Sequence, residues 1–132
     1  MRRLQWSEAR GAAVAFVAII AFTWFGGTLA VGAHPWWAAK VGYIGSGLGL
    51  AVWLGLQIGG LSGRATLLAA TAGLLAAAVL TWLGKARFAA SYAEDALAGR
   101  LWFFGSIAVM AAALVVLASL ANLASANRRS AA

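Results

Sequence analysis

The fold is decided by an uncharged apolar stretch, GAAVAFVAIIAFTWFGGTLAVGA, at residues 11–33. A helix needs about 20 predominantly apolar residues to cross the hydrocarbon core of a bilayer. This stretch is long enough, and it contains no acidic or basic side chain. The sequence therefore predicts a transmembrane helix at these residues.

The charged residues divide the rest of the chain into three more apolar blocks. Of 132 residues, 64% are hydrophobic and 10% are charged, whereas a soluble domain carries about 25% charged residues. We therefore predict an all-α integral membrane protein with a single four-helix domain, residues 1–132. Its transmembrane helices are expected at about 11–33, 37–60, 64–83 and 101–123, with a short interfacial segment at 85–100.

The N-terminal region also has features of a secretory signal peptide. Arg2 and Arg3 precede the apolar stretch, and the small residues at 31–33 resemble a cleavage site. The apolar stretch is longer than the roughly 7–15 residues usual for a signal peptide. We therefore expect a helix that is retained.

The basic residues predict the orientation of the chain. Four crossings place both termini on one side of the membrane, and basic residues are enriched on the cytoplasmic side. The terminal side would hold six of the ten: Arg2, Arg3, Arg10, Arg64, Arg128 and Arg129. The other side would hold Lys40, Lys85, Arg87 and Arg100. This bias favours cytoplasmic termini, and the richness in Ala and Gly favours a bacterial inner membrane protein.

Small residues recur at every fourth position of the second and third blocks. Within lipid, such residues let two helices approach closely enough for van der Waals packing. The second block carries Gly45, Gly47, Gly49, Ala51, Gly55 and Gly59, and the third carries Ala65, Ala69, Gly73 and Ala77. Because the connector at 61–63 is short, we expect these two helices to form a tight antiparallel hairpin through those residues.

Aromatic side chains gather on the side opposite the termini. The aromatic residues that we single out there are Trp36, Trp37, Trp82, Phe88, Tyr92 and Trp102. Tryptophan and tyrosine favour the membrane–water interface, because the ring is apolar and its N–H or O–H is polar. An interfacial belt is the first interpretation, and a contact surface for a partner, a lipid or a quinone is the second.

The sequence offers few groups for chemistry. No ionisable residue lies in the central part of a predicted span, although such residues mark proton and ion pathways. Cysteine is absent, and the single histidine, His34, stands at a helix edge. We therefore expect no enzyme, no metal site and no cofactor. Gln57 is the best candidate for a buried polar path.

These observations favour a non-catalytic accessory subunit of a larger membrane complex, such as a respiratory, photosynthetic or transport assembly. Its partners would be the lipid bilayer and other membrane subunits. Two alternatives stay open: a small homo-oligomeric channel or transporter, and a quinone- or lipid-binding anchor. The net charge of +7 does not indicate nucleic acid, because the basic residues stand at the block edges, where they meet lipid headgroups.

Overall fold

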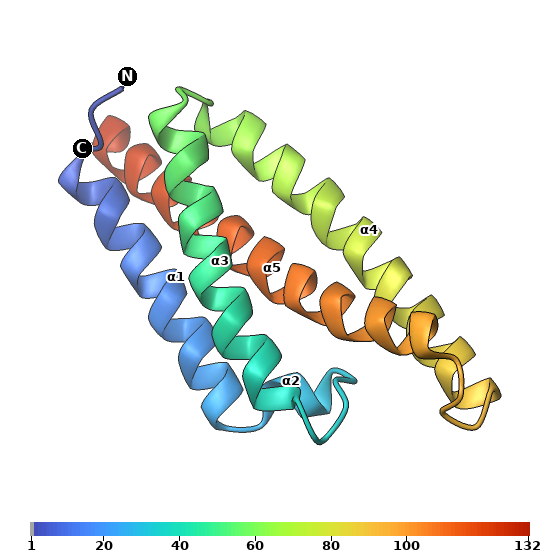
Figure 1. Ribbon diagram of the computed structural model, residues 1–132. Helices are drawn as coiled ribbons and strands as arrows, with labels where there is room; N and C mark the ends of the chain where they lie inside the picture. Colours follow the sequence, from blue (N-terminus) through green and yellow to red (C-terminus); the bar gives the residue numbers. More distant parts are fainter. Residues whose placement is uncertain (1) are drawn as a thin grey trace.

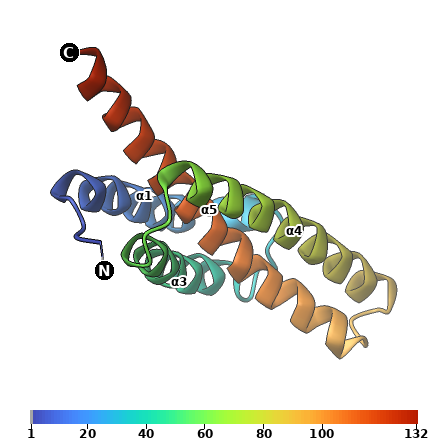
Figure 2. The same cartoon turned by 90° about the horizontal axis from the view of Figure 1, so that it is seen from above.

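A computed structural model describes residues 2–132 of the chain, and these residues fold into helices joined by short turns (Figure 1). The helices are α1 (Trp6–Trp24), α2 (Gly27–Ala30), α3 (Ala38–Ile58), α4 (Gly63–Ala90) and α5 (Ala96–Ala131). Both termini lie at the same end of the molecule in two perpendicular views (Figures 1 and 2).

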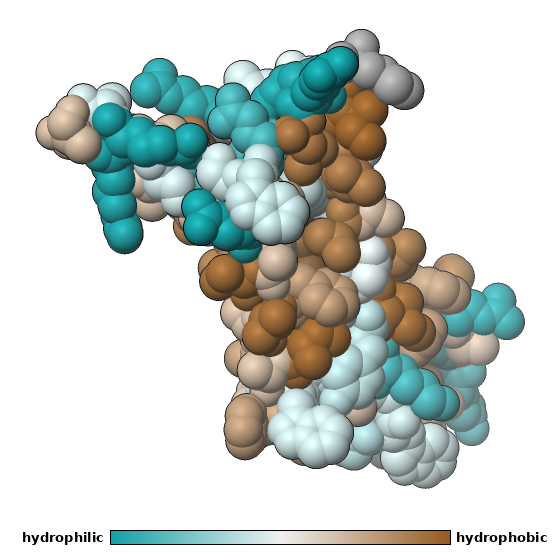
Figure 3. Space-filling view, turned by 90° about the vertical axis from the view of Figure 1, so that its left-hand side faces the viewer, coloured by the Kyte–Doolittle hydropathy of each residue, from teal (hydrophilic) through white to brown (hydrophobic). Residues whose placement is uncertain are grey.

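Four of the helices, α1, α3, α4 and α5, are long and apolar enough to cross a membrane. Figure 3 shows the corresponding surface, an apolar band with hydrophilic side chains gathered toward its two ends. This arrangement indicates a multi-pass membrane protein, because a bilayer requires an apolar belt bounded by two polar zones.

The helix α5 is the one against which the others pack, since α1, α3 and α4 all contact it. At 36 residues and a rise of about 1.5 Å per residue it is about 54 Å long, well beyond the roughly 30 Å hydrocarbon core. Its C-terminal turns accordingly project past the other helices (Figure 2).

The first membrane helix is displaced toward the N-terminus from the predicted span at residues 11–33. It starts at Trp6, where Gln5 and Glu8 form a capping box. It ends at Trp24 because Gly26 adopts a left-handed conformation, with φ +81°, which glycine accepts without steric cost. The short α2 and a turn follow, so the last third of the predicted span is not part of α1.

The predicted interfacial segment at 85–100 is absent as a separate element. Residues 85–90 instead complete α4, and α5 begins at Ala96. The turn between them contains two non-glycine residues with positive φ, Tyr92 and Ala93. Asp95 then caps α5, because its carboxylate accepts a hydrogen bond of 3.0 Å from the Ala98 N–H. This strong N-cap fixes where the last helix begins.

The structure also differs from the predicted packing of the second span on the third. The helices α3 and α4 do not pack along their length; they diverge from their connecting turn, and each packs on α5 (Figure 1). A Cβ at Gly49 would lie 2.7 Å from the Ala111 carbonyl oxygen, and one at Gly84 would lie 2.7 Å from the Trp102 nitrogen. Small residues therefore do mediate close helix packing, but they mediate it with α5.

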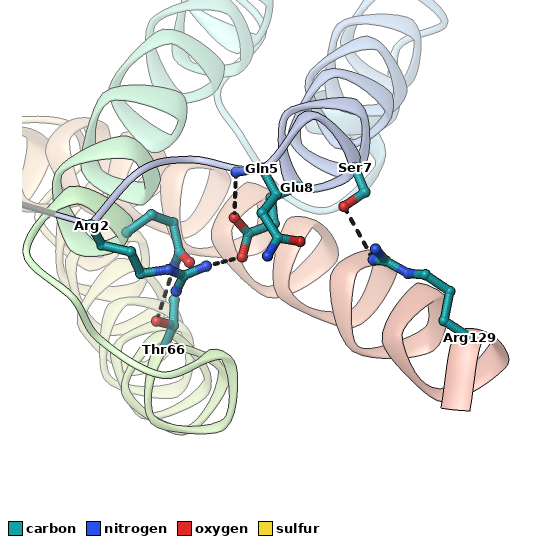
Figure 4. A network of polar contacts seen from close by, with 7 residues as sticks. Arg2, Gln5, Ser7, Glu8, Thr66 and Arg129 are labelled. Carbon is teal, nitrogen blue, oxygen red and sulfur yellow. Dashed lines mark hydrogen bonds and ion pairs between the residues drawn. The ribbon is translucent and has the colours of Figure 1, made fainter. Parts of the chain in front are cut away.

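One buried polar contact holds α3 and α4 together beside their turn. The Gln57 side-chain amide donates to the Thr66 hydroxyl at 3.3 Å, and both side chains are buried. Thr66 is labelled in Figure 4. Gln57 is therefore engaged in joining two helices at the end of the molecule that carries the termini.

Replacing Thr66 by valine should destabilise the fold by about 1–2 kcal/mol, because it removes the acceptor of a buried amide. The measurement is the free energy of unfolding from detergent micelles on titration with dodecyl sulfate. Thr71→Val is the matched control, since Thr71 is exposed on the same helix. Equal effects of the two substitutions would show that the Gln57–Thr66 bond contributes nothing.

Candidate functional site

Trp102 is the centre of an aromatic cluster at the end of the molecule opposite the termini. Its side chain is 7% exposed, and its indole N–H donates to the Gly32 carbonyl at 3.2 Å. Phe88 of α4 packs beside it, with ring centroids 5.7 Å apart. The indole therefore ties α5 to α4 and to the segment between α2 and α3.

His34 joins this cluster from the turn before α3. Its ring stacks on Trp37 with the centroids 4.5 Å apart, and it meets the edge of Trp102 at 5.2 Å. The Nδ1 atom accepts a hydrogen bond of 3.2 Å from the backbone N–H of Trp36. The Trp36 ring also lies edge-on to it at 5.4 Å, so the imidazole contacts three aromatic rings and one backbone donor.

The aromatic residues predicted as a contact surface fall into two groups. Trp37, Phe88 and Trp102 come together in the cluster. The other three are largely exposed: Trp36 at 86%, Trp82 at 66% and Tyr92 at 92%. The first group stabilises the fold, and the second is available to headgroups or to another molecule.

A cavity of about 320 Å³ opens beside the aromatic cluster. Its walls come from the α2–α3 region, from α4 and from α5, so it occupies the space left where α3 and α4 diverge. The lining residues are Thr28, Val31, Gly32, Ala33, Val41, Ala78, Thr81, Trp82, Lys85, Ser106, Val109 and Met110.

Lys85 supplies the charged group of this cavity. Its ammonium lies 5.6 Å from the centroid of the Trp102 ring, a distance typical of a cation–π contact. A Cβ on Gly32 would be 3.2 Å from the same nitrogen, and Gly32 has φ +109°. Glycine at this position therefore both permits the turn and leaves room for the ammonium group.

The small residues predicted to pack helices divide between two faces. Gly45 and Gly49 meet the backbone of α5, and Ala77 is buried. The remaining ones point outward: Gly47, Ala51, Gly55, Gly59, Ala65, Ala69 and Gly73. At Gly47, Gly55 and Gly73, no atom of residues 2–132 outside the local helix turn lies within 4 Å of where a Cβ would stand. We call Gly47, Ala51 and Gly55 the outward row of α3.

A second hollow, of about 520 Å³, lies between α1 and α5 at the end that carries the termini. Arg10, Arg128 and Arg129 line it, and the Arg129 guanidinium donates to the Ser7 hydroxyl at 3.1 Å (Figure 4). The nearby Glu8 does not line it and instead pairs with Arg2. This groove therefore presents three cationic side chains, which suits the phosphates of a lipid headgroup layer.

Sequence reasoning missed the cavity, although it noted two of its residues separately: Trp82 as an aromatic contact residue and Lys85 as a basic residue opposite the termini. Thr28 and Ser106 stand out as polar residues inside apolar stretches, and Lys85 stands out as the charge that ends a span. The signal that could have joined them is the pair Gly26–Gly27, which breaks the first span and brings the segment before α3 toward Lys85. No family model, curated protein or solved structure matches the chain.

Proposed function

We propose that this chain is a non-catalytic accessory subunit that packs against the transmembrane helices of another membrane protein. The observation that carries the proposal is the outward row of α3. In lipid the hydrophobic effect does not drive helices together, so a face of small residues is the feature that permits close association.

The outward row is separate from the packing face that the chain uses itself. Gly45 and Gly49 contact α5, whereas Gly47 and Gly55 have open space where a side chain would begin. Residues four apart lie on one side of a helix, so the row forms a shallow strip flanked by the exposed side chains of Ile44 and Leu48. Such a strip accommodates a neighbouring helix.

A partner with several helices can contact α4 and the outward row of α3 at the same time. Of the four candidate spans, α4 buries the smallest share of its residues, and Leu68, Leu75 and Val79 are exposed along it. Lipid can cover these side chains of α4, so the outward row of α3 carries the proposal and α4 offers the same partner a second contact surface. A respiratory, photosynthetic or transport assembly supplies such a surface.

The proposed location is a bacterial inner membrane with both termini in the cytoplasm. Three of the six basic residues assigned to the terminal side, Arg10, Arg128 and Arg129, line the groove at that end. Basic residues beside spans are enriched on the cytoplasmic side.

The test is co-purification from native membranes in a mild detergent. The wild-type chain should emerge in fixed stoichiometry with other membrane proteins, and Gly55→Leu should lose them while keeping its helical content and elution volume. Ala39→Leu, at an exposed position outside the row, is the matched control and should retain the partners.

Two outcomes would overturn the proposal. Isolation of the wild-type chain only as a monomer or homodimer would favour the homo-oligomeric alternative. Retention of every partner by Gly55→Leu would show that the outward row of α3 is not the docking face.

A further inference from the structure

We propose that the cavity beside the aromatic cluster binds a long-chain carboxylate, with the carboxylate at Lys85 and the alkyl chain between α3, α4 and α5. This inference goes beyond the proposed function and does not depend on it, because the outward row of α3 plays no part in it. It rests on the charge at one end of the cavity and on the character of its walls.

The mouth of the cavity holds a cation with no acidic neighbour in the lining. Lys85 is the one charged residue among the side chains that line the cavity, and the ion pair found in residues 2–132 lies at the opposite end, between Arg2 and Glu8. Asp95 accepts a hydrogen bond from the backbone of α5. A cation at the edge of a low-dielectric region is stabilised by an anionic ligand, and Lys85 is exposed enough to receive one.

The walls are less polar than their residue types indicate, because every hydroxyl in the lining already donates its proton to a backbone carbonyl of the chain. Thr28 donates to the Ala38 carbonyl at 2.6 Å, and Thr81 donates to Ala77 at 2.6 Å. Ser106 donates to Trp102 at 2.7 Å. The hydroxyls therefore offer no donor to a ligand, so Lys85 is the charged donor of the lining and the rest of the walls suit an alkyl chain.

The other wall residues and the dimensions of the cavity agree with the carboxylate end of one alkyl chain, whose remaining carbons extend into the lipid. Val41, Val109 and Met110 supply apolar side chains. The volume of about 320 Å³ is at the lower end of the roughly 300–1,000 Å³ typical of ligand pockets. From Lys85 to Ala78 the helix α4 rises about 10 Å, so the cavity extends from the mouth at Lys85 into the apolar part of the molecule.

Binding can be measured on the full chain in detergent by quenching of tryptophan fluorescence, since Trp82 lines the cavity and bromine quenches indoles at short range. The probes are dibromostearate and its methyl ester, which differ in charge at the head. We expect saturable quenching by the carboxylate, with a Kd about tenfold lower than that of the ester.

Variants assign the site. Lys85→Met should raise the Kd of the carboxylate to that of the ester, and Lys85→Arg should restore the preference. Lys40→Met, which removes an exposed lysine outside the cavity, should leave the preference for the carboxylate over the ester unchanged. Ala78→Phe should abolish saturable quenching by both probes, because the added ring occupies the space for the chain. Circular dichroism and elution volume verify that each variant is folded.

Equal affinities for carboxylate and ester, or an unchanged preference in Lys85→Met, would overturn the proposal. Tighter saturable binding of a brominated phosphatidylglycerol would overturn it in favour of a phospholipid. Displacement of the carboxylate by a short-chain ubiquinone at lower concentration would overturn it in favour of a quinone. Loss of carboxylate binding in a chain that still co-purifies with its partners separates this inference from the proposed function.

Discussion

Replacing Trp102 by alanine should destabilise the protein by about 3–5 kcal/mol, the range for truncation of a buried tryptophan. The indole of Trp102 is 7% exposed, bonds to the Gly32 carbonyl and packs on His34, Trp37 and Phe88. Its removal leaves a void where three segments meet. The measurement is the free energy of unfolding from micelles on titration with dodecyl sulfate.

A second substitution of Trp102 separates its packing from its hydrogen bond, and a substitution of Trp36 serves as the control. Trp102→Phe keeps most of the packing but leaves the Gly32 carbonyl without its donor, so a loss of about 1–3 kcal/mol is expected. Trp36→Ala removes an indole that is 86% exposed and should change stability by no more than about 0.5 kcal/mol. If Trp36→Ala lowered the free energy of unfolding as much as Trp102→Ala, the conclusion that the aromatic cluster stabilises the fold would be contradicted.

Gly49→Leu should prevent α3 from packing on α5 as it does now. A Cβ at this position would lie 2.7 Å from the Ala111 carbonyl oxygen and 3.0 Å from the Ala111 Cα, and backbone atoms cannot move aside as a flexible side chain can. Overpacking typically costs about 1–3 kcal/mol, occasionally more, and a contact against backbone should reach the upper end. The readouts are unfolding free energy and monodispersity in detergent.

Gly47→Leu is the matched control, because it makes the same chemical change on the same helix two residues away. In the described part of the chain, no atom outside the local helix turn lies within 4 Å of a Cβ at Gly47, so the folded chain should keep its stability. The pair also separates fold from assembly, since Gly47 belongs to the outward row of α3. Similar destabilisation by Gly47→Leu and Gly49→Leu would contradict the packing of α3 described above.

The four spans could be predicted from the sequence because the signal for a membrane helix is local. Length and absence of charge are properties of a continuous stretch, and all four stretches correspond to helices. The ends were less predictable where local capping chemistry acts. Gln5 with Glu8 starts α1 early, Gly26 ends it, and Asp95 sets the start of α5.

Which helices pack against each other within the chain could not be predicted, because small residues occur on more than one face of a helix. The row with the most regular spacing, Gly47 to Gly59, points away from the molecule, and the neighbouring pair Gly45 and Gly49 meets α5. A short connector between α3 and α4 fixes only where they meet. Whether they then pack or diverge depends on competition from α5, which is distant in sequence.

The cavity was unpredictable for the same reason. Its lining comes from segments separated by many residues, and it exists because α3 and α4 diverge. Lys85 could be recognised in the sequence as a charge at a helix end, but its position over Trp102 and next to Gly32 depends on the turn that follows α2.

The length of α5 has a mechanical consequence. One uninterrupted helix runs from the N-cap at Asp95, beside the aromatic end, to Arg128 and Arg129 at the opposite end. No proline interrupts α5, and its Gly105–Ser106 pair is of the kind at which long helices bend. The N-cap at Asp95 and the two arginines therefore belong to one continuous helix, and a tilt of α5 as a unit would displace both of its ends together.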